Sequence, residues 1–86
     1  MSITAETAKA HAKDPAVTCC RFEVGTVIDV ANLEDPAIFA DLEDSGLLEI
    51  TSECLTIEQV LGATITKTID SLTPITADMV DKVKEV

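Results

Sequence analysis

The sequence predicts a mostly β fold, in which short strands are joined by short helical turns and preceded by a short N-terminal helical arm. Its 86 residues are enough for one domain at most. Stretches rich in β-branched residues and broken by Gly or Pro recur at residues 16–30, 63–69 and 72–80. Helix-capping residues followed by helical spacing lie between these stretches. We therefore expect an arm at residues 1–15 and a compact β domain at residues 16–86.

The arm is predicted as a helix at residues 2–13. Thr4 is a suitable N-cap, and Asp14 followed by Pro15 stops the helix. The apolar residues of this segment are mainly alanine, so the helix buries little apolar surface and is marginal in isolation. We expect the arm either to fray or to become ordered by docking on another surface.

Residues 16–30 predict a strand, a tight turn and a second strand. The β-branched residues give the strands, and Gly25 suits the turn. Successive side chains of a strand point to opposite faces. The neighbouring thiols of Cys19 and Cys20 are therefore expected on opposite sides, and a disulfide between them is expected to be strained.

The middle of the chain switches to helical spacing. Asp35 suits an N-cap, Pro36 suits the first helical position, and Gly46 suits a left-handed position at the end. This predicts a helix over residues 35–45. The stretch that follows, residues 46–50, is predicted to be a strand.

The last third of the chain predicts a one-turn helix, a strand and a terminal turn. Thr56 and Gln59 have the spacing of a capping box, and Gly62 closes the turn. Apolar and polar residues alternate over residues 63–69, as they do in a half-buried strand. Residues 72–86 predict a turn, a short strand and a capped terminal turn.

The chain also repeats part of itself. Residues 22–33 align without gaps with residues 69–80, and both run from a polar turn through Thr and an apolar pair to an apolar end. The matched positions are Thr26 with Thr73, Ile28 with Ile75, and Leu33 with Val80. This repeat predicts two halves of one fold, although two short hairpins can also converge on such a pattern.

The block at residues 57–80 resembles the closing half of the SAF domain, also called the antifreeze-like domain. This family includes type III fish antifreeze proteins and the C-terminal domain of sialic acid synthases. Its opening hairpin resembles residues 16–33 more weakly, and the resemblance covers roughly residues 16–83. The matching elements are Val60-Leu61-Gly62, the strand from Ile65 to Ile69, Ile75-Thr76 and Met79-Val80.

The resemblance implies a pretzel-like β-clip whose halves are related by an approximate internal dyad. The chain departs from the family in two places. Leu72 occupies a turn position where the family usually has glycine, and the acidic insertion at residues 34–50 is longer than in antifreeze members.

The charge of the chain is strongly negative. The formal net charge is −10, and no Lys or Arg lies between Phe22 and Thr66. This composition disfavours nucleic acids and anionic membrane surfaces, and it suits either a solvated surface or a basic partner. The sequence contains no apolar run long enough to span a bilayer and no signal-peptide pattern at its N-terminus. We therefore expect an intracellular protein.

The cysteines and the single histidine predict no metal site, cofactor or catalytic pair. Cys19, Cys20 and Cys54 form no even disulfide framework and are expected to be free, buried or half-buried thiols. His11 lies on the arm, and no spacing in the sequence requires it to meet a cysteine. We therefore expect the chain not to be an enzyme.

Two functions follow from the resemblance and are kept as alternatives. The first is ice binding, which needs a flat surface of weakly polar groups, whereas Asp29 places a hydrated charge on the corresponding strand. The second is carbohydrate binding as a detached accessory domain, for which the resemblance implies a basic residue near the start of the domain. Arg21 is the candidate, although the preceding "TCC" departs from the family motif.

The function favoured by elimination is a non-catalytic interaction or structural module. Such a chain would be a small subunit or decoration protein of a larger assembly, with a virus particle as one example. Its partners would be other proteins or further copies of itself. The side chains predicted to bind the partner are Ile3, Thr7, Ala8, His11 and Arg21.

Overall fold

The helices and strands of this chain are all short. A computed structural model describes residues 3–83, so Met1 and Ser2 of the predicted arm and residues 84–86 lie outside the described residues. In chain order the elements, with η for a 3-10 helix, are α1 (Ala5–Ala10), η1 (Val30–Asn32), η2 (Pro36–Ile38), α2 (Phe39–Asp44), α3 (Ile57–Val60), β1 (Thr64–Ile65), η3 (Ala77–Met79) and β2 (Val80–Asp81). They form a small mixed body with a radius of gyration of 11.5 Å.

The helical turns begin where the capping residues predict. The Thr4 side chain accepts a hydrogen bond from the Thr7 N–H at the start of α1, at 3.2 Å. The Asp35 side chain caps η2, which begins with proline. Thr56 and Gln59 form the predicted capping box around α3. Local side-chain hydrogen bonds therefore set these helix starts.

The prediction of a mostly β fold is only partly confirmed. Within residues 3–83, β1 and β2 are the strands of a single antiparallel pair, in which Thr64 faces Asp81 and Ile65 faces Val80. The remaining extended segments meet through isolated bridges. The fold is therefore a mixture of short helices, one strand pair and irregular extended chain.

The strand predicted at residues 46–50 is wrong. The backbone N–H groups of Leu47 and Leu48 both donate to the Leu42 carbonyl, at 3.0 and 3.2 Å, and Gly46 has a left-handed φ of 79°. These bonds complete the C-terminal end of α2. The N–H groups of Leu47 and Leu48 therefore bond within the helix end and are not available to pair with a neighbouring strand.

Two stretches of the chain are hydrogen-bonded in the same pattern. We call residues 16–34 the first half and residues 63–81 the second half, and residues 47 positions apart in the sequence are equivalent. Phe22 and its equivalent Ile69 exchange both backbone hydrogen bonds, at 2.9 and 3.0 Å. The bridge of Thr18 with Leu33 has its equivalent in the pairing of Ile65 with Val80.

Further backbone bonds recur when the two halves are exchanged. The equivalent pairs are Cys19 N to Asn32 O (3.2 Å) with Thr66 N to Met79 O (2.8 Å), Gly25 N to Ile65 O (2.8 Å) with Leu72 N to Thr18 O (2.9 Å), Ile65 N to Thr26 O (2.9 Å) with Thr18 N to Thr73 O (3.1 Å), and Ile28 N to Ala63 O (2.9 Å) with Ile75 N to Ala16 O (2.9 Å). The sequence repeat therefore corresponds to a repeat in backbone pairing.

The main core lies between the two halves. Ile28 and its equivalent Ile75 are both buried, as are Leu33 and its equivalent Val80. Thr18 is a buried polar residue of this region, and its Oγ1 donates to the Asp70 carbonyl at 2.7 Å and accepts from the Thr73 N–H at 3.0 Å. Burial of the equivalent apolar residues therefore joins both halves into one core.

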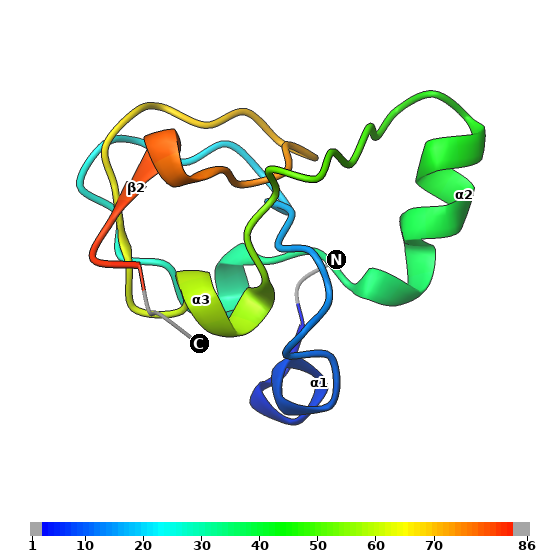
Figure 1. Cartoon of the computed structure of the whole chain (residues 1–86), viewed down its shortest axis with the longest axis horizontal. Coiled ribbons are helices and arrows are strands. Elements are labelled where there is room, and N and C mark those ends of the chain that lie inside the picture. Colours follow the sequence, from blue (N-terminus) through cyan, green and yellow to red (C-terminus); the bar gives the residue numbers. More distant parts are fainter. Residues whose placement is uncertain (1–2, 84–86) are drawn as a thin grey trace.

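The acidic insertion forms a lobe with its own small core. Figure 1 shows α2 at one end of the molecule and β2 at the other. Phe39 and Leu48 of this lobe are buried against Val17, and Leu42 and Ile50 pack on them. The acidic residues of α2 remain exposed, so the lobe is apolar inside and negatively charged outside.

The arm packs on the rest of the chain. Ile3 and Ala8 are buried in the main core, and the Ile3 N–H donates to the Leu33 carbonyl at 3.2 Å. The Lys13 Nζ lies 2.5 Å from the Glu58 Oε1. Docking on the domain's own surface therefore orders this weakly apolar helix, and the division into residues 1–15 and 16–86 stays a prediction.

Candidate functional site

Cys19 and Cys20 form a pair of neighbouring thiols. Their Sγ atoms lie 3.7 Å apart, and both residues are free cysteines in a bend of the chain. The prediction that they point to opposite sides is wrong, because the chain bends here and the alternation of a strand does not apply. Cys20 is exposed and Cys19 is half-buried. The pair is therefore open to solvent at one thiol and covered at the other.

The chain around Cys19 holds its thiol in place. The Cys19 Sγ donates to the Ala31 carbonyl at 3.4 Å, and its backbone N–H donates to the Asn32 carbonyl at 3.2 Å. Burial raises the pKa of the Cys19 thiol, and the hydrogen bond and charge of Cys20 and the charge of Glu34 raise it further. Cys19 is therefore kept in the thiol form beside a more accessible neighbour.

The second half has a different pair at the equivalent position, Thr66 and Lys67. The Thr66 Oγ1 donates to the Asp78 carbonyl at 3.5 Å, which is the equivalent of the Cys19 bond to Ala31. The Lys67 Nζ lies 2.9 Å from the Asp78 Oδ2. The Thr76 hydroxyl bond and the Lys67 ion pair lower the pKa of Asp78. The second half thus has the hydroxyl of Thr66 and the ion-paired Lys67 at the two positions where the first half has thiols.

The third thiol, Cys54, lies at the contact between the halves. Its Sγ donates to the carbonyls of Ala16 and Leu55, at 3.5 and 3.4 Å. Burial raises the pKa of Cys54. This half-buried thiol behaves as a small packed side chain and provides an internal comparison for the exposed one at Cys20.

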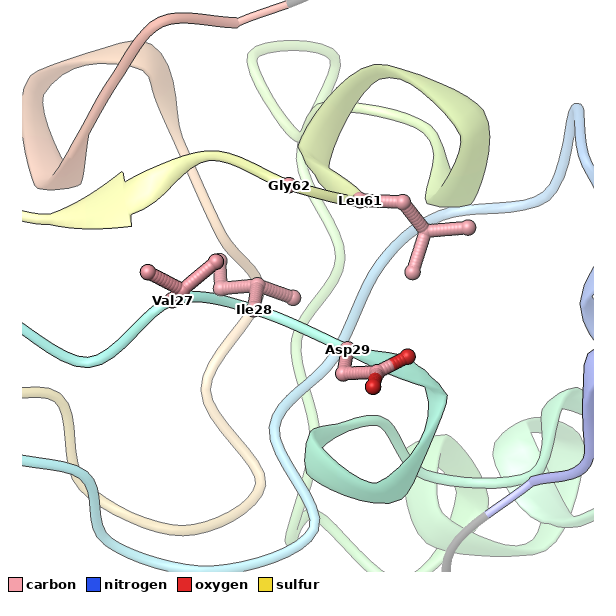
Figure 2. A pocket seen from close by; sticks show the side chains of 5 residues that line it. All are labelled: Val27, Ile28, Asp29, Leu61 and Gly62. Atoms are coloured by element: carbon pink, nitrogen blue, oxygen red, sulfur yellow. The ribbon is translucent and has the colours of Figure 1, made fainter.

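A hollow of about 430 Å³ opens beside the link between α3 and β1. Figure 2 shows that it is lined by Val27, Ile28, Asp29, Leu61 and Gly62. Val27 is 58% exposed, and the carboxylate of Asp29 caps η1. The hollow is therefore an open surface depression with an apolar edge and one structural carboxylate.

Leu61 also lines a second hollow, of about 290 Å³, between α1 and α3. Its other apolar lining residues are Ala5 and Ala8 of α1, Ala12 and Val30, and Lys9 and Glu58 add charge. We call the surface formed by Val27, Val30 and Leu61 the Leu61 face. It is an apolar surface that spans both hollows.

The five residues predicted to bind a partner are dispersed. Ile3 and Ala8 are buried in the main core, and Thr7 is half-buried on α1. The His11 Nδ1 lies 2.5 Å from the Asp14 Oδ2, and the Arg21 Nε lies 4.0 Å from the Asp70 Oδ1. Partner binding by these residues stays a prediction.

Sequence reasoning missed the close thiol pair and the Leu61 face. The alignment of the two halves was the available signal for the thiols, because it places Cys19 and Cys20 against Thr66 and Lys67. Within residues 3–83, no group of three or more His, Cys, Asp or Glu side chains is placed to hold a metal ion. None of the helices in that range has the length and apolar character needed to cross a membrane.

Comparison with known proteins gives a whole-chain match to part of a reductase precursor. The chain is 62% identical over all of its 86 residues to the D-proline reductase proprotein PrdA of Acetoanaerobium sticklandii, and it spans 14% of the length of that protein. No family model matches the chain. No solved structure matches it.

This match corrects several predictions. The assignment to the SAF or antifreeze-like family is wrong, because the matched relative is a reductase proprotein and no family model supports the assignment. The predicted roles as a non-catalytic assembly module, a virion component, an ice-binding protein or a detached carbohydrate-binding domain are overturned by the same relative. The prediction that the chain is not an enzyme is also wrong, since the relative is an enzyme precursor.

Proposed function

We propose that this chain serves as the corresponding segment of a D-proline reductase proprotein. The observation that carries the proposal is the 62% identity over all 86 residues, with no part of the chain left unmatched. The chain corresponds to 14% of the relative, so the activity would belong to the longer polypeptide. D-Proline would be the substrate of that larger protein, which needs a reductant for the reaction.

Within the reductase, we propose that the Leu61 face contacts the remainder of the enzyme. Val27 is 58% exposed, and Leu61 borders both hollows, which suits burial by another apolar surface. The formal charge of −10 favours a basic surface around that contact. Thr7, His11 and Arg21 would belong to the polar surroundings of the same or a neighbouring contact.

The finer architecture proposed for the segment is a β-clip, a pretzel-like arrangement of two similar halves. The recurrence of equivalent backbone bonds, centred on Phe22 and Ile69, supports this description. We further propose protein partners or additional copies of the chain, and no nucleic acid or membrane partner, because the net charge is strongly negative. An intracellular location fits the three free cysteines.

A segment exchange tests the proposed function. The matched segment of the Acetoanaerobium sticklandii proprotein is replaced with this chain, and consumption of D-proline is measured with a supplied reductant. We expect a rate close to that of the unaltered protein, with L-proline as the substrate control. A folded chimera that shows no D-proline-dependent consumption of the reductant would contradict the proposal.

Charge substitutions test the proposed contact. Val27→Glu in the chimera should reduce reductase activity and weaken the contact with the remaining polypeptide, because it places a charge in an apolar interface at a residue of the Leu61 face that is 58% exposed. Leu47→Glu is the matched control, since Leu47 is 64% exposed in the separate α2 lobe. Equal effects of the two substitutions on activity would exclude the Leu61 face as the contact.

A further inference from the structure

We propose that Cys19 and Cys20 form a reversible dithiol–disulfide couple that exchanges with small-molecule disulfides. The inference goes beyond the proposed function and does not rest on it, because it concerns two side chains within the described residues. Its basis is the placement of the two thiols and their difference from the equivalent pair in the second half.

The geometry brings the two sulfur atoms together. The Sγ atoms are 3.7 Å apart in a bend, on the same side of the chain. A disulfide has a sulfur–sulfur distance of about 2.0 Å, so closure requires the two side chains to move toward each other. Cys54 donates its thiol to carbonyls elsewhere in the fold, so it is not the partner of either thiol.

The fold does not require thiols at this position. In the second half, Thr66 makes the hydroxyl bond to the Asp78 carbonyl that Cys19 makes to Ala31. Lys67, the equivalent of Cys20, is exposed and adds an ion pair to Asp78. The same backbone arrangement is thus built with side chains that have no redox chemistry. The thiol pair is therefore a feature of the first half that backbone pairing does not explain.

Exposure decides the order of the exchange. The exposed Cys20 thiolate attacks one sulfur of an external disulfide, forms a mixed disulfide and releases one thiolate. Cys19, which is half-buried, then loses its proton and attacks the Cys20 sulfur, and the second external thiolate leaves. In sum, two protein thiols and one external disulfide give one protein disulfide and two external thiols. The protein loses two electrons and two protons, and the external disulfide gains them.

The raised pKa of Cys19 makes the second step dependent on pH. Burial keeps this thiol protonated, so ring closure should accelerate as the pH rises toward the Cys19 pKa. The groups facing Cys19 are the Cys20 thiol, the Glu34 carboxylate and the Ala31 carbonyl. Burial is the main reason that the Cys19 thiolate is disfavoured, and the neighbouring Cys20 and Glu34 add to it, which accounts for the direction of the dependence.

The closed couple is expected to be easily reduced. Two adjacent residues hold their Cα atoms about 3.8 Å apart, below the range of usual disulfides, so the ring is strained. Strained and exposed disulfides have more oxidising potentials than structural ones. The couple should therefore reopen in thiol buffers that leave structural disulfides intact.

The experiment uses the full chain with Cys54→Ser, which leaves only the two thiols of interest. The protein is equilibrated in oxygen-free buffers with graded ratios of glutathione to glutathione disulfide, acid-quenched, alkylated and analysed by mass spectrometry of the intact chain and of its peptides. The expected result is a monomer that has lost a pair of hydrogens, with both cysteines in one cross-linked peptide. Addition of excess glutathione should restore both thiols.

Two variants provide the controls. Cys19→Thr/Cys20→Lys copies the equivalent pair of the second half, so it should keep the fold and lose the oxidation completely. Cys19→Ser should stop the exchange after its first step and accumulate glutathione on Cys20. Circular dichroism of both variants, compared with the parent chain, verifies that the fold is kept.

Other outcomes would overturn the proposal. A parent chain that stays fully reduced, or that accumulates a stable glutathione adduct on Cys20, would show that Cys19 does not close the ring. Disulfide-linked dimers as the main product would assign Cys20 to contacts between chains. None of these results bears on the segment exchange with D-proline, so failure of this proposal is distinguishable from failure of the proposed function.

Discussion

The two halves of the molecule have the same backbone pairing and different surfaces. Ile28 and Ile75 are identical and buried at equivalent positions. At the exposed position of the same repeat, Cys20 in the first half corresponds to Lys67 in the second. The comparison indicates that burial constrains the inward positions of the repeat, whereas the outward positions are available for chemistry.

Two pairs of equivalent positions do not follow this division into constrained buried residues and variable exposed ones. Thr18 is buried and polar, whereas its equivalent Ile65 is buried and apolar. Gly25 and its equivalent Leu72 both have a left-handed backbone, with φ of 94° and 53°. Only the glycine adopts this conformation without a steric cost. The halves therefore differ in the polarity of one buried side chain and in the residue at one left-handed turn position.

The largest expected effect concerns the shared core. Ile28→Ala and Ile75→Ala should each lower the free energy of unfolding by about 2–5 kcal/mol, because each leaves a cavity at a fully packed position. Urea unfolding followed by circular dichroism measures the loss. We expect a single transition in both variants, since the two residues pack in one core.

Val24→Ala provides the control for this pair. Val24 is 61% exposed, so its substitution should change the free energy of unfolding by less than about 0.5 kcal/mol. Two separate transitions, or a large loss in only one of the isoleucine variants, would show that the halves do not fold as a unit.

The next largest effect is expected at Thr18. Thr18→Val keeps the shape of the side chain and removes the Oγ1 that bonds to the Asp70 carbonyl and the Thr73 N–H. Leaving these groups without their partner should cost about 1–3 kcal/mol. The equivalent substitution, Ile65→Val, only shortens an apolar side chain and should cost about 0.5–1.5 kcal/mol. Thermal or urea unfolding of the two variants compares them, and a smaller loss for Thr18→Val would contradict a bonding role.

The two turn positions should respond differently to substitution. Gly25→Ala introduces a Cβ at a left-handed residue, and it should destabilise the chain by about 1–2 kcal/mol. Beyond Gly25 and its two neighbours in the chain, no heavy atom of the described residues lies within 4 Å of that Cβ, so the cost comes from the backbone conformation. Leu72→Gly relieves the same type of strain but removes a half-buried side chain. We expect it to stay within about 0.5 kcal/mol of the parent, because these two effects offset each other.

The same unfolding measurement decides this comparison. A neutral Gly25→Ala would mean that the turn can shift out of the left-handed region. A loss of more than about 2 kcal/mol for Leu72→Gly would mean that packing of the leucine dominates its backbone strain.

The sequence predicted the parts of the fold that depend on local hydrogen bonds. Thr4, Asp35 and Thr56 each mark a helical turn, because a side-chain oxygen next to a helix start accepts a nearby N–H. The repeat was visible because equivalent buried positions need similar side chains. Leu72 was singled out only through the resemblance to the SAF domain, which is wrong, and its left-handed backbone was seen first in the structure.

Features that run against the local residue pattern, or that depend on long-range packing, were not predictable in this way. Residues 46–50 have a strand-like composition, yet Leu47 and Leu48 use their N–H groups to end α2. The alanine-rich arm gave no sign that Ile3 would be buried in the main core. Likewise, alternation in a strand predicted separated thiols, and the bend at Cys19 and Cys20 brings them together.

The smallest expected effect lies on the surface of the second half. The Thr76 hydroxyl and Lys67 lower the pKa of Asp78, so the folded state favours the charged carboxylate. Its contribution to stability is therefore present above the ordinary carboxyl pKa of about 3.9 and is lost as the pH falls through the lower folded value. Asp78→Asn should reduce the loss of stability on acidification, measured by urea unfolding at pH 7 and in steps below pH 4. Ala31→Ser at the equivalent position is the control, because it adds no titrating group and should leave the loss of stability on acidification unchanged. If Asp78→Asn and the parent chain lose the same stability between pH 7 and the steps below pH 4, the ion pair is fully screened by solvent, as exposed pairs often are.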